Sequence, residues 1–317
     1  MRRWAALIAV VVGCAEDVPE PPATLVMGIE LPVPFNPAFF TLAFDPRDSL
    51  VMSDTVRLVR VTATGTTSLV GTEQLATNPE FGSDSDGELL VGGQVPALFR
   101  LTGDNALVQL GPAPPALPFF APVGTPAGNH HIDVRAPFGP HVLAAGGTTW
   151  DPGPDMRRTL RAPDGTLFAI RDGGIVRFAG DDTTTVITGC AFAGPNCGLL
   201  ALGGFDGADR LYVAEPDATE IRVIDLAGTV ETLDLPSELV VVDVRATPQL
   251  TAVLAKNPAR ENELTVWLIV DGAFERVALV GESFDGFPNR LVADHAGNMY
   301  VQHAHRLDAL LLRGGGS

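Results

Sequence analysis

The sequence lacks the short motifs that mark common catalytic chemistries. It contains no GxSxG, SxxK, HExxH or P-loop sequence, and so shows no nucleophile elbow, zinc-protease helix or phosphate-binding loop. No window keeps a 3.6-residue period of apolar residues, so we expect few helices. Glycine and proline are scattered throughout, and no change of composition divides the chain. These absences favour one all-β domain and leave an enzymatic role uncertain, with the balance toward none.

Positive charge is scarce. The chain has 21 Lys and Arg against 38 Asp and Glu, for a net charge of −17, and Lys256 is its one lysine. A strongly acidic protein repels polyphosphate backbones and anionic lipid surfaces. We therefore expect no nucleic-acid partner.

The sequence has no apolar run of the roughly 20 residues needed to span a bilayer. Its N-terminus instead has two arginines, a short apolar run over residues 4–12, and then Gly-Cys, a pattern typical of an export signal. The end of this run resembles a bacterial lipobox with Cys14 as the lipidated residue. The resemblance implies a signal peptide over 1–13 and a lipoprotein anchored to the membrane of the bacterial cell envelope, facing the periplasm or the cell surface. An ordinary secretory peptide is the alternative.

Residues 14–23 are acidic and rich in proline. Such a segment buries little apolar surface, so we expect an extended tether. Further along, Cys190 and Cys197 are separated by six residues that include Gly194-Pro195. In an exported protein this spacing predicts a disulfide. A metal pair is the alternative, although no histidine or further cysteine lies nearby in the sequence.

A turn followed by an apolar triplet recurs along the chain. Glycine, or once proline, lies next to Asp in most copies and favours the turn, and the triplet suits a buried strand. The turns fall at positions 45, 86, 164, 206 and 296. Their spacing is about 40 residues or about twice that, which indicates a repeat with two less obvious copies.

Each unit is expected to hold four short antiparallel strands, as in the blade of a β-propeller. The clearest unit predicts strands at 199–202, 211–213, 221–226 and 230–235. One of the less obvious units predicts 240–244, 250–254, 264–270 and 274–279. The other, between 111 and 156, shows strand character only at 132–134 and 141–145. We expect a single all-β domain over 24–317, with seven blades, or six as the alternative.

The last unit is one strand short. It predicts strands at 289–294, 298–302 and 306–312, and then the chain ends in GGGS. Residues 24–31 have strand character but belong to no unit. We expect them to pair beside 307–312 and close the ring, because an uncovered apolar edge strand promotes aggregation.

Two stretches carry a family resemblance: LVADHAGNMYV at 291–301 and RLYVAEPDATEIRVIDLAG at 210–228. They resemble NHL-type repeats, a class shared with SMP-30-like and gluconolactonase-like propellers. The resemblance implies the fold but no single function, since such propellers include enzymes, binding modules and scaffolds. Gluconolactonase-like members hold a divalent metal by Glu and Asn side chains in a central channel.

The resemblance leaves a metal site open without fixing it. His303 and His305 are two apart in an extended segment and so point the same way. Asp133, Asp243 and Asn289 lie near inner strands. No third ligand stands at matching spacing, so we predict no cofactor, with calcium or another divalent metal as the alternative.

Long loops on one face of a propeller are the usual place for binding. The aromatic candidates on that face are Phe119, Phe120, Phe192, Phe284 and Phe287. Their alternative role is to cover the ends of the core. We predict a binding or interaction module without its own catalysis, with an unknown protein or small-molecule ligand on the loop face. The alternative is a metal-dependent propeller hydrolase or lyase, lactonase-like, with its site in the channel.

Overall fold

The computed structural model describes the chain in separate ranges. These are residues 23–30, 42–53, 58–61, 67–70, 79–83, 88–93, 97–112, 120–124, 130–134, 141–143, 149–150, 156–162, 167–171, 174–179, 182–187, 201–260, 263–282, 289–303 and 306–312. Within them the chain forms strands and turns and no helix. Accordingly, none of these ranges contains a helix with the length and apolar character to cross a membrane.

The described residues form seven four-stranded antiparallel sheets, which we term blades and number along the chain. Blade 1 comprises β2 (Leu42–Phe44), β3 (Leu50–Ser53), β4 (Leu58–Val61) and β5 (Thr67–Val70). Blade 2 comprises β6 (Pro79–Ser83), β7 (Leu89–Gly93), β8 (Ala97–Leu101) and β9 (Leu107–Pro112). Blade 3 comprises β10 (Phe120–Gly124), β11 (His130–Val134), β12 (His141–Leu143) and β13 (Thr149–Trp150). Blade 3 occupies the segment in which only a degenerate unit could be predicted.

The remaining blades follow the same order. Blade 4 comprises β14 (Met156–Arg161), β15 (Leu167–Arg171), β16 (Gly174–Ala179) and β17 (Asp182–Ile187). Blade 5 comprises β18 (Ala201–Phe205), β19 (Leu211–Ala214), β20 (Glu220–Ile224) and β21 (Val230–Asp234). Blade 6 comprises β22 (Val240–Ala246), β23 (Thr251–Asn257), β24 (Glu263–Val270) and β25 (Ala273–Glu282). Blade 7 comprises β26 (Asn289–Ala293), β27 (Met299–His303), β28 (Arg306–Leu312) and β1 (Ala23–Glu30).

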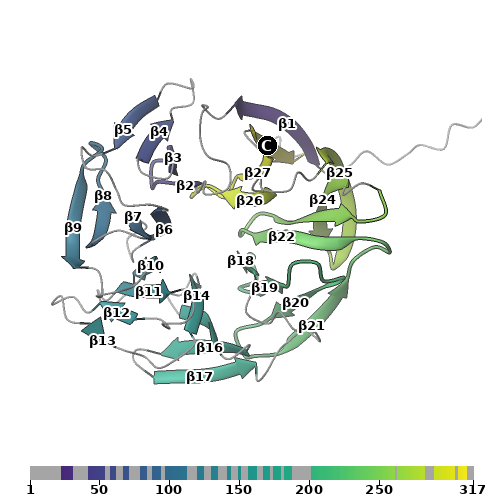
Figure 1. Ribbon diagram of the computed structural model, residues 1–317. Helices are drawn as coiled ribbons and strands as arrows, with labels where there is room; N and C mark the ends of the chain where they lie inside the picture. Colours follow the sequence, from purple (N-terminus) through teal and green to yellow (C-terminus); the bar gives the residue numbers. More distant parts are fainter. Residues whose placement is uncertain are drawn as a thin grey trace, which may run out of the picture.

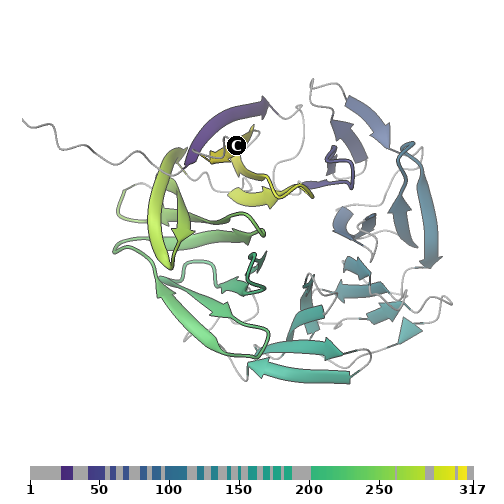
Figure 2. The ribbon, with the colours of Figure 1, turned by 180° about the vertical axis from the view of Figure 1, so that it is seen from behind.

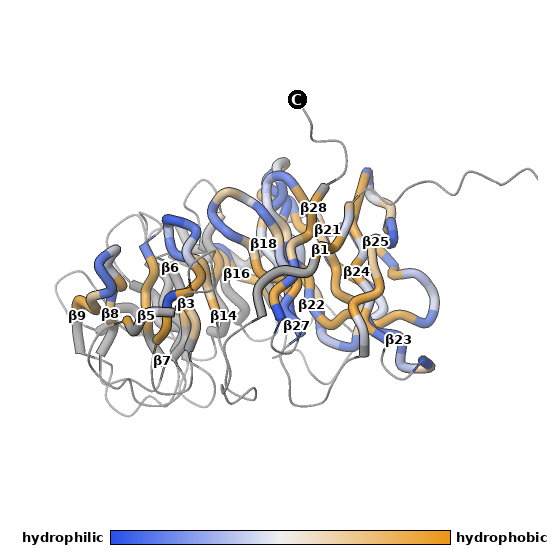
Figure 3. Tube along the Cα trace, turned by 90° about the horizontal axis from the view of Figure 1, so that it is seen from above, coloured by the Kyte–Doolittle hydropathy of each residue, from blue (hydrophilic) through white to orange (hydrophobic). Residues whose placement is uncertain are grey.

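The blades stand around a ring, so the chain is a β-propeller (Figure 1). The first strand of each unit lies toward the ring axis and the fourth lies at the rim, an arrangement also seen from behind (Figure 2). Apolar residues follow the strands and polar residues the turns (Figure 3). The buried apolar side chains gather in clusters between consecutive blades, such as the one in which Val51 and Leu58 of blade 1 pack with Leu90 of blade 2. The sheets are thus stabilised by burial between blades.

The two ends of the described chain meet in blade 7, as predicted. Strand β1 pairs antiparallel with β28, and Ala23 lies opposite Leu312. Ala23 is fully buried, and Leu25 packs against the apolar cluster that blades 6 and 7 share. The fourth strand of the last unit is therefore supplied from the other end of the chain.

The recurring turn is held by its aspartate. In blade 5, Oδ1 of Asp206 accepts hydrogen bonds from the N–H groups of Ala208 and Arg210, both at 2.9 Å. Oδ2 accepts from the Tyr212 hydroxyl at 3.2 Å. Although burial raises the pKa of Asp206, the hydrogen bonds from Arg210 and Ala208 outweigh it and hold that pKa below its usual value. The aspartate thus joins the turn to the following buried strand.

Blade 7 repeats this arrangement. Oδ1 of Asp294 accepts from the Asn298 N–H at 2.8 Å, and Oδ2 accepts from the Tyr300 hydroxyl at 3.1 Å. Burial, together with the neighbouring Asp294 carboxylate, raises the pKa of Tyr300 to about 12, so its hydroxyl stays a donor at neutral pH. The Asp and Tyr of the repeat therefore act as one structural pair.

The inner strand of blade 5 runs further than the sequence predicted. We expected 199–202, ending before the glycine pair, whereas β18 continues through Gly203 and Gly204 to Phe205. A Cβ on Gly203 would lie 2.8 Å from Val244, and one on Gly204 only 2.4 Å from the carbonyl oxygen of Ala246. The two glycines therefore allow β18 to approach β22 of blade 6 closely, instead of ending the strand.

Gly204→Ala is expected to lower the free energy of unfolding by about 2–3 kcal/mol, because it adds a backbone clash to a positive φ of 116°. The matched control is Gly272→Ala, at φ 79° with nothing within 4 Å of the added carbon, which should cost about 1 kcal/mol. Urea unfolding of both variants checks the difference. An equal loss of unfolding free energy in the two variants would show that the contact with Ala246 does not contribute to the cost of Gly204→Ala.

Candidate functional site

On the inner strands, the charged side chains that the structure describes are those of Asp243, Arg245 and Arg290, in blades 6 and 7. Asp243 lies on β22, and its Oδ2 accepts a hydrogen bond at 2.8 Å from the N–H of Leu291 on β26. Its Oδ1 accepts from the N–H of Val244 at 2.9 Å. Each carboxylate oxygen is therefore bound by a backbone donor, and the side chain ties two neighbouring blades together.

The electrostatics around Asp243 are dominated by arginines. Burial raises the pKa of Asp243, and the Leu291 N–H, Arg245 and Arg290 act in the opposite direction. Burial likewise lowers the pKa of Arg245, which the charge of Asp243 partly offsets. Both arginines are thus near enough to Asp243 to favour its charged form.

Arg245 is the least satisfied of these groups. It is two residues from Asp243 on the same strand, and so lies on the same side of the sheet. Among the described residues it makes neither a hydrogen bond nor an ion pair with a side chain, and its Nε is buried without a partner. The Nε–H of this half-buried guanidinium is enclosed, so only its terminal nitrogens could reach a ligand or water.

Of the residues that the sequence suggested as metal ligands, the structure places Asp133, Asp243, His303 and Asn289 on strands of three blades. Asp133 lies on β11 in blade 3 and Asp243 on β22 in blade 6, with blades 4 and 5 between them. His303 lies on β27, the second strand of blade 7, beside Gly281 of β25. Asn289 is its neighbour across the strand pair. In the described part of the chain, no three His, Cys, Asp or Glu side chains are placed to hold a metal ion.

A divalent cation also fits poorly at Asp243 itself. Two backbone donors already take one lone pair of each oxygen, and the charges of Arg245 and Arg290 would repel the ion.

Other predicted site residues lie outside the described residues. These are Cys14, Cys190, Cys197, His305, Phe119, Phe192, Phe284 and Phe287. Phe120 and Asp133 are described by their backbone alone, on β10 and β11. The lipidation site, the disulfide and the aromatic loop face stay predictions.

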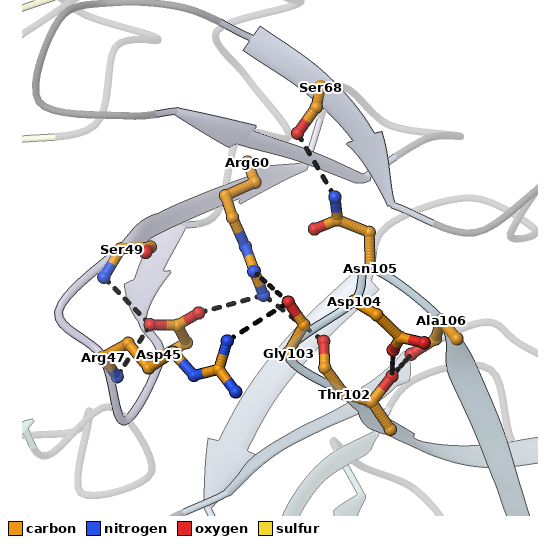
Figure 4. Close-up of polar contacts among 10 residues, drawn as sticks. All are labelled: Asp45, Arg47, Ser49, Arg60, Ser68, Thr102, Gly103, Asp104, Asn105 and Ala106. Atoms are coloured by element: carbon orange, nitrogen blue, oxygen red, sulfur yellow. Dashed lines mark hydrogen bonds and ion pairs between the residues drawn. The ribbon is translucent and has the colours of Figure 1, made fainter.

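A second polar cluster joins blades 1 and 2 (Figure 4). Arg60 on β4 forms an ion pair with Asp45 at 2.9 Å, with both side chains almost fully buried. The same guanidinium donates to the carbonyl of Gly103, in the turn between β8 and β9, at 3.1 Å. Asp45 also accepts from the N–H groups of Arg47 and Ser49, both at 2.9 Å. Every described contact of this cluster is internal, so its role is structural.

Sequence reasoning missed Arg60 and Arg245 for different reasons. Arg245 had a local signal, because Asp243-x-Arg245 in a strand places opposite charges on one side of a sheet. Arg60 had none, since its partner in blade 2 is about 40 residues away and only the packing of blades brings the two together.

No protein-family model matches the sequence, and no curated protein matches it by sequence. Solved structures match by fold. A streptogramin B lyase superposes with a TM-score of 0.70 at 10% identity, covering 91% of this chain and 98% of that one. A chain of the mitotic checkpoint complex gives 0.68 at 11%, covering 98% of each. A gluconolactonase from Xanthomonas campestris gives 0.51 at 14%, covering 92% and 89%. At such identities the likeness shows the propeller fold alone.

Proposed function

We propose that this β-propeller is an exported, lipid-anchored binding module without its own catalysis, which takes its ligand at the inner strands of blades 6 and 7. It would be held to a membrane of the bacterial cell envelope through Cys14, on the periplasmic or outer side. The protein would capture its ligand and present it there unchanged.

One observation carries this proposal. Asp243 is the acidic side chain that the structure describes on an inner strand, and both of its oxygens bind backbone N–H groups. These two bonds take one lone pair of each oxygen and fix the carboxylate as a link between two blades, a structural role that needs no catalysis. The neighbouring Arg245 offers donors and charge, which suit recognition of a ligand.

The alternative is a metal-dependent hydrolase or lyase, lactonase-like. The fold likeness to a streptogramin B lyase and to a gluconolactonase favours it, but at 10% and 14% identity no site residue can be transferred. The mitotic checkpoint complex in the same set shows that this likeness is shared by proteins of quite different kinds.

The binding role and the enzymatic alternative differ in whether the ligand is chemically changed. Native mass spectrometry of the protein purified from its own envelope should reveal a bound small molecule that is recovered unaltered after prolonged incubation. In parallel, gluconolactone and a streptogramin B should show no turnover above buffer with Mg²⁺, Mn²⁺ or Ca²⁺ added. Turnover that a chelator and Asp243→Ala both abolish would overturn the binding role and establish the alternative.

The membrane anchor has a separate test. Cys14→Ser is expected to move the protein from the membrane fraction to the soluble fraction and to abolish labelling by a radioactive lipid precursor, because the acylated thiol is lost. Cys190→Ser serves as the control and should still be labelled. A Cys14→Ser protein that still sediments with membranes contradicts lipid anchoring.

A further inference from the structure

Few large apolar side chains are exposed in the part of the chain that the structure describes. Those between 42% and 56% exposed are Val26, Val108, Val230, Leu279 and Leu311. Three of them lie singly, on the outer strands of blades 2, 5 and 6. The other two, Val26 on β1 and Leu311 on β28, share blade 7.

Val26 and Leu311 lie on the same side of blade 7. Leu311 is opposite Thr24 in the pairing of β1 with β28, and Thr24 is two residues from Val26. Side chains that are opposite each other, or two apart along a strand, point to the same side of a sheet. The neighbouring Leu25 and Leu310 point to the other side, into the cluster shared with blade 6. The two exposed side chains therefore form one small apolar patch, which we term the rim patch.

Blade 1 covers this side of β28 only at the other end of the strand. Leu307 is 2% exposed and belongs to the apolar cluster that includes Leu42 and Val61 of blade 1. Leu311 is four residues further along the same side and is 52% exposed. An apolar surface that the neighbouring blade leaves uncovered is available to something outside the propeller.

The rim patch adjoins the point where the described chain begins. Ala23 lies opposite Leu312, the neighbour of Leu311. Val26 is three residues further along β1, about 10 Å away in an extended strand. The predicted lipidation site Cys14 precedes Ala23 by nine residues (23 − 14), which span at most about 32 Å when fully extended. A lipid on Cys14 would therefore keep this edge of blade 7 close to the bilayer.

We propose that the rim patch rests on the membrane that holds Cys14, so that the outer edge of blade 7 faces the lipid. The inference rests on the lipid anchor proposed above and adds an orientation to it. Two side chains would bind a free protein to a bilayer only weakly. A short tether, however, keeps them at an effective concentration of about 1 mM or more, at which a weak contact orients the molecule.

The charge of the chain selects the kind of lipid surface. At a net charge of −17 the protein is repelled by anionic headgroups, so the rim patch is expected to rest on zwitterionic lipid. With its rim on the membrane, the propeller has its ring axis along the plane of the bilayer (Figure 1). A ligand then reaches the inner strands from either face of the ring.

Tryptophans placed in the rim patch test this orientation. Val26→Trp and Leu311→Trp, as full lipidated proteins, are reconstituted into phosphatidylcholine vesicles whose acyl chains carry bromine, which quenches tryptophan fluorescence on contact. Both should be quenched about threefold more strongly than Val108→Trp and Val230→Trp, because only the patch lies at the acyl boundary. These matched controls replace similarly exposed valines on the outer strands of blades 2 and 5. The unmodified protein sets the baseline.

Equal quenching at the four positions, or none at positions 26 and 311, would overturn the orientation. Melting curves show whether each variant is folded, and the second patch position decides the case if the first destabilises the blade. Unquenched protein that instead cross-links as a dimer, with Leu311→Ser abolishing the cross-link, would mean that a second copy covers the patch. Lipid labelling of Cys14 separates the two proposals. Labelled but unquenched protein refutes the orientation and leaves the anchor standing, whereas unlabelled protein refutes both.

Discussion

Deletion of residues 23–30 is expected to lower the free energy of unfolding by on the order of 4 kcal/mol and to cause aggregation. The deletion removes β1, including the fully buried Ala23 and the packed Leu25. It also uncovers β28, where Leu310 is 4% exposed in the intact blade. Each large apolar side chain taken out of contact costs about 1.5–3 kcal/mol, and an exposed apolar edge recruits other chains.

Urea unfolding and light scattering measure the two effects. Deletion of residues 15–21, in the predicted tether, is the matched control and should leave both unchanged. Identical unfolding midpoints for the two truncations would mean that β1 does not close the ring.

Asp45→Ala is expected to cost about 3 kcal/mol of unfolding free energy. It removes the acceptor of two backbone N–H groups in the turn and leaves Arg60 buried without its ion-pair partner. Breaking a buried pair from one side typically costs 3–5 kcal/mol. The bonds from Arg60 to the Gly103 and Thr102 carbonyls should hold the loss near the lower end of that range.

Two further variants separate the turn from the ion pair. Asp225→Ala removes a turn aspartate whose bond from the Thr229 N–H, at 2.7 Å, is exposed, and which forms no ion pair within the described ranges, so its loss should be much smaller. The double variant Asp45→Ala, Arg60→Met removes both charges and should recover part of the stability. A double variant less stable than Asp45→Ala alone would show that Arg60 stabilises the blades independently of Asp45.

Much of the fold was predictable because each repeat is specified by residues that are close together in the sequence. The Asp turn and the apolar triplet after it need only neighbouring residues, and strands such as β19, with four consecutive buried residues, follow from them. The strands of blade 6 were predicted within a few residues, since alternation and length are local too. Ring closure followed from a strand count, which uses no three-dimensional information.

The parts that sequence did not predict depend on contacts between blades. In the sequence, Gly203 and Gly204 resemble the end of a strand. The structure shows that β22 of the next blade passes so close to them that a side chain would not fit. The Asp243 bond to Leu291 joins residues 48 apart. Any residue other than proline offers a backbone N–H, so the identity of Leu291 does not reveal the bond. The sequence therefore could not show whether the Asp243 carboxylate is hydrogen-bonded or free.

The contact between Lys256 and Asp217 has a practical consequence. Lys256, on β23, forms an ion pair at 2.6 Å with Asp217, in the turn between β19 and β20, and so crosses from blade 6 to blade 5. It is the one lysine in the sequence. Apart from the amino terminus, amine-reactive reagents therefore have a single target, and its side chain is 27% exposed within the ion pair. A fluorophore coupled there would place a single reporter group at the contact between blades 5 and 6.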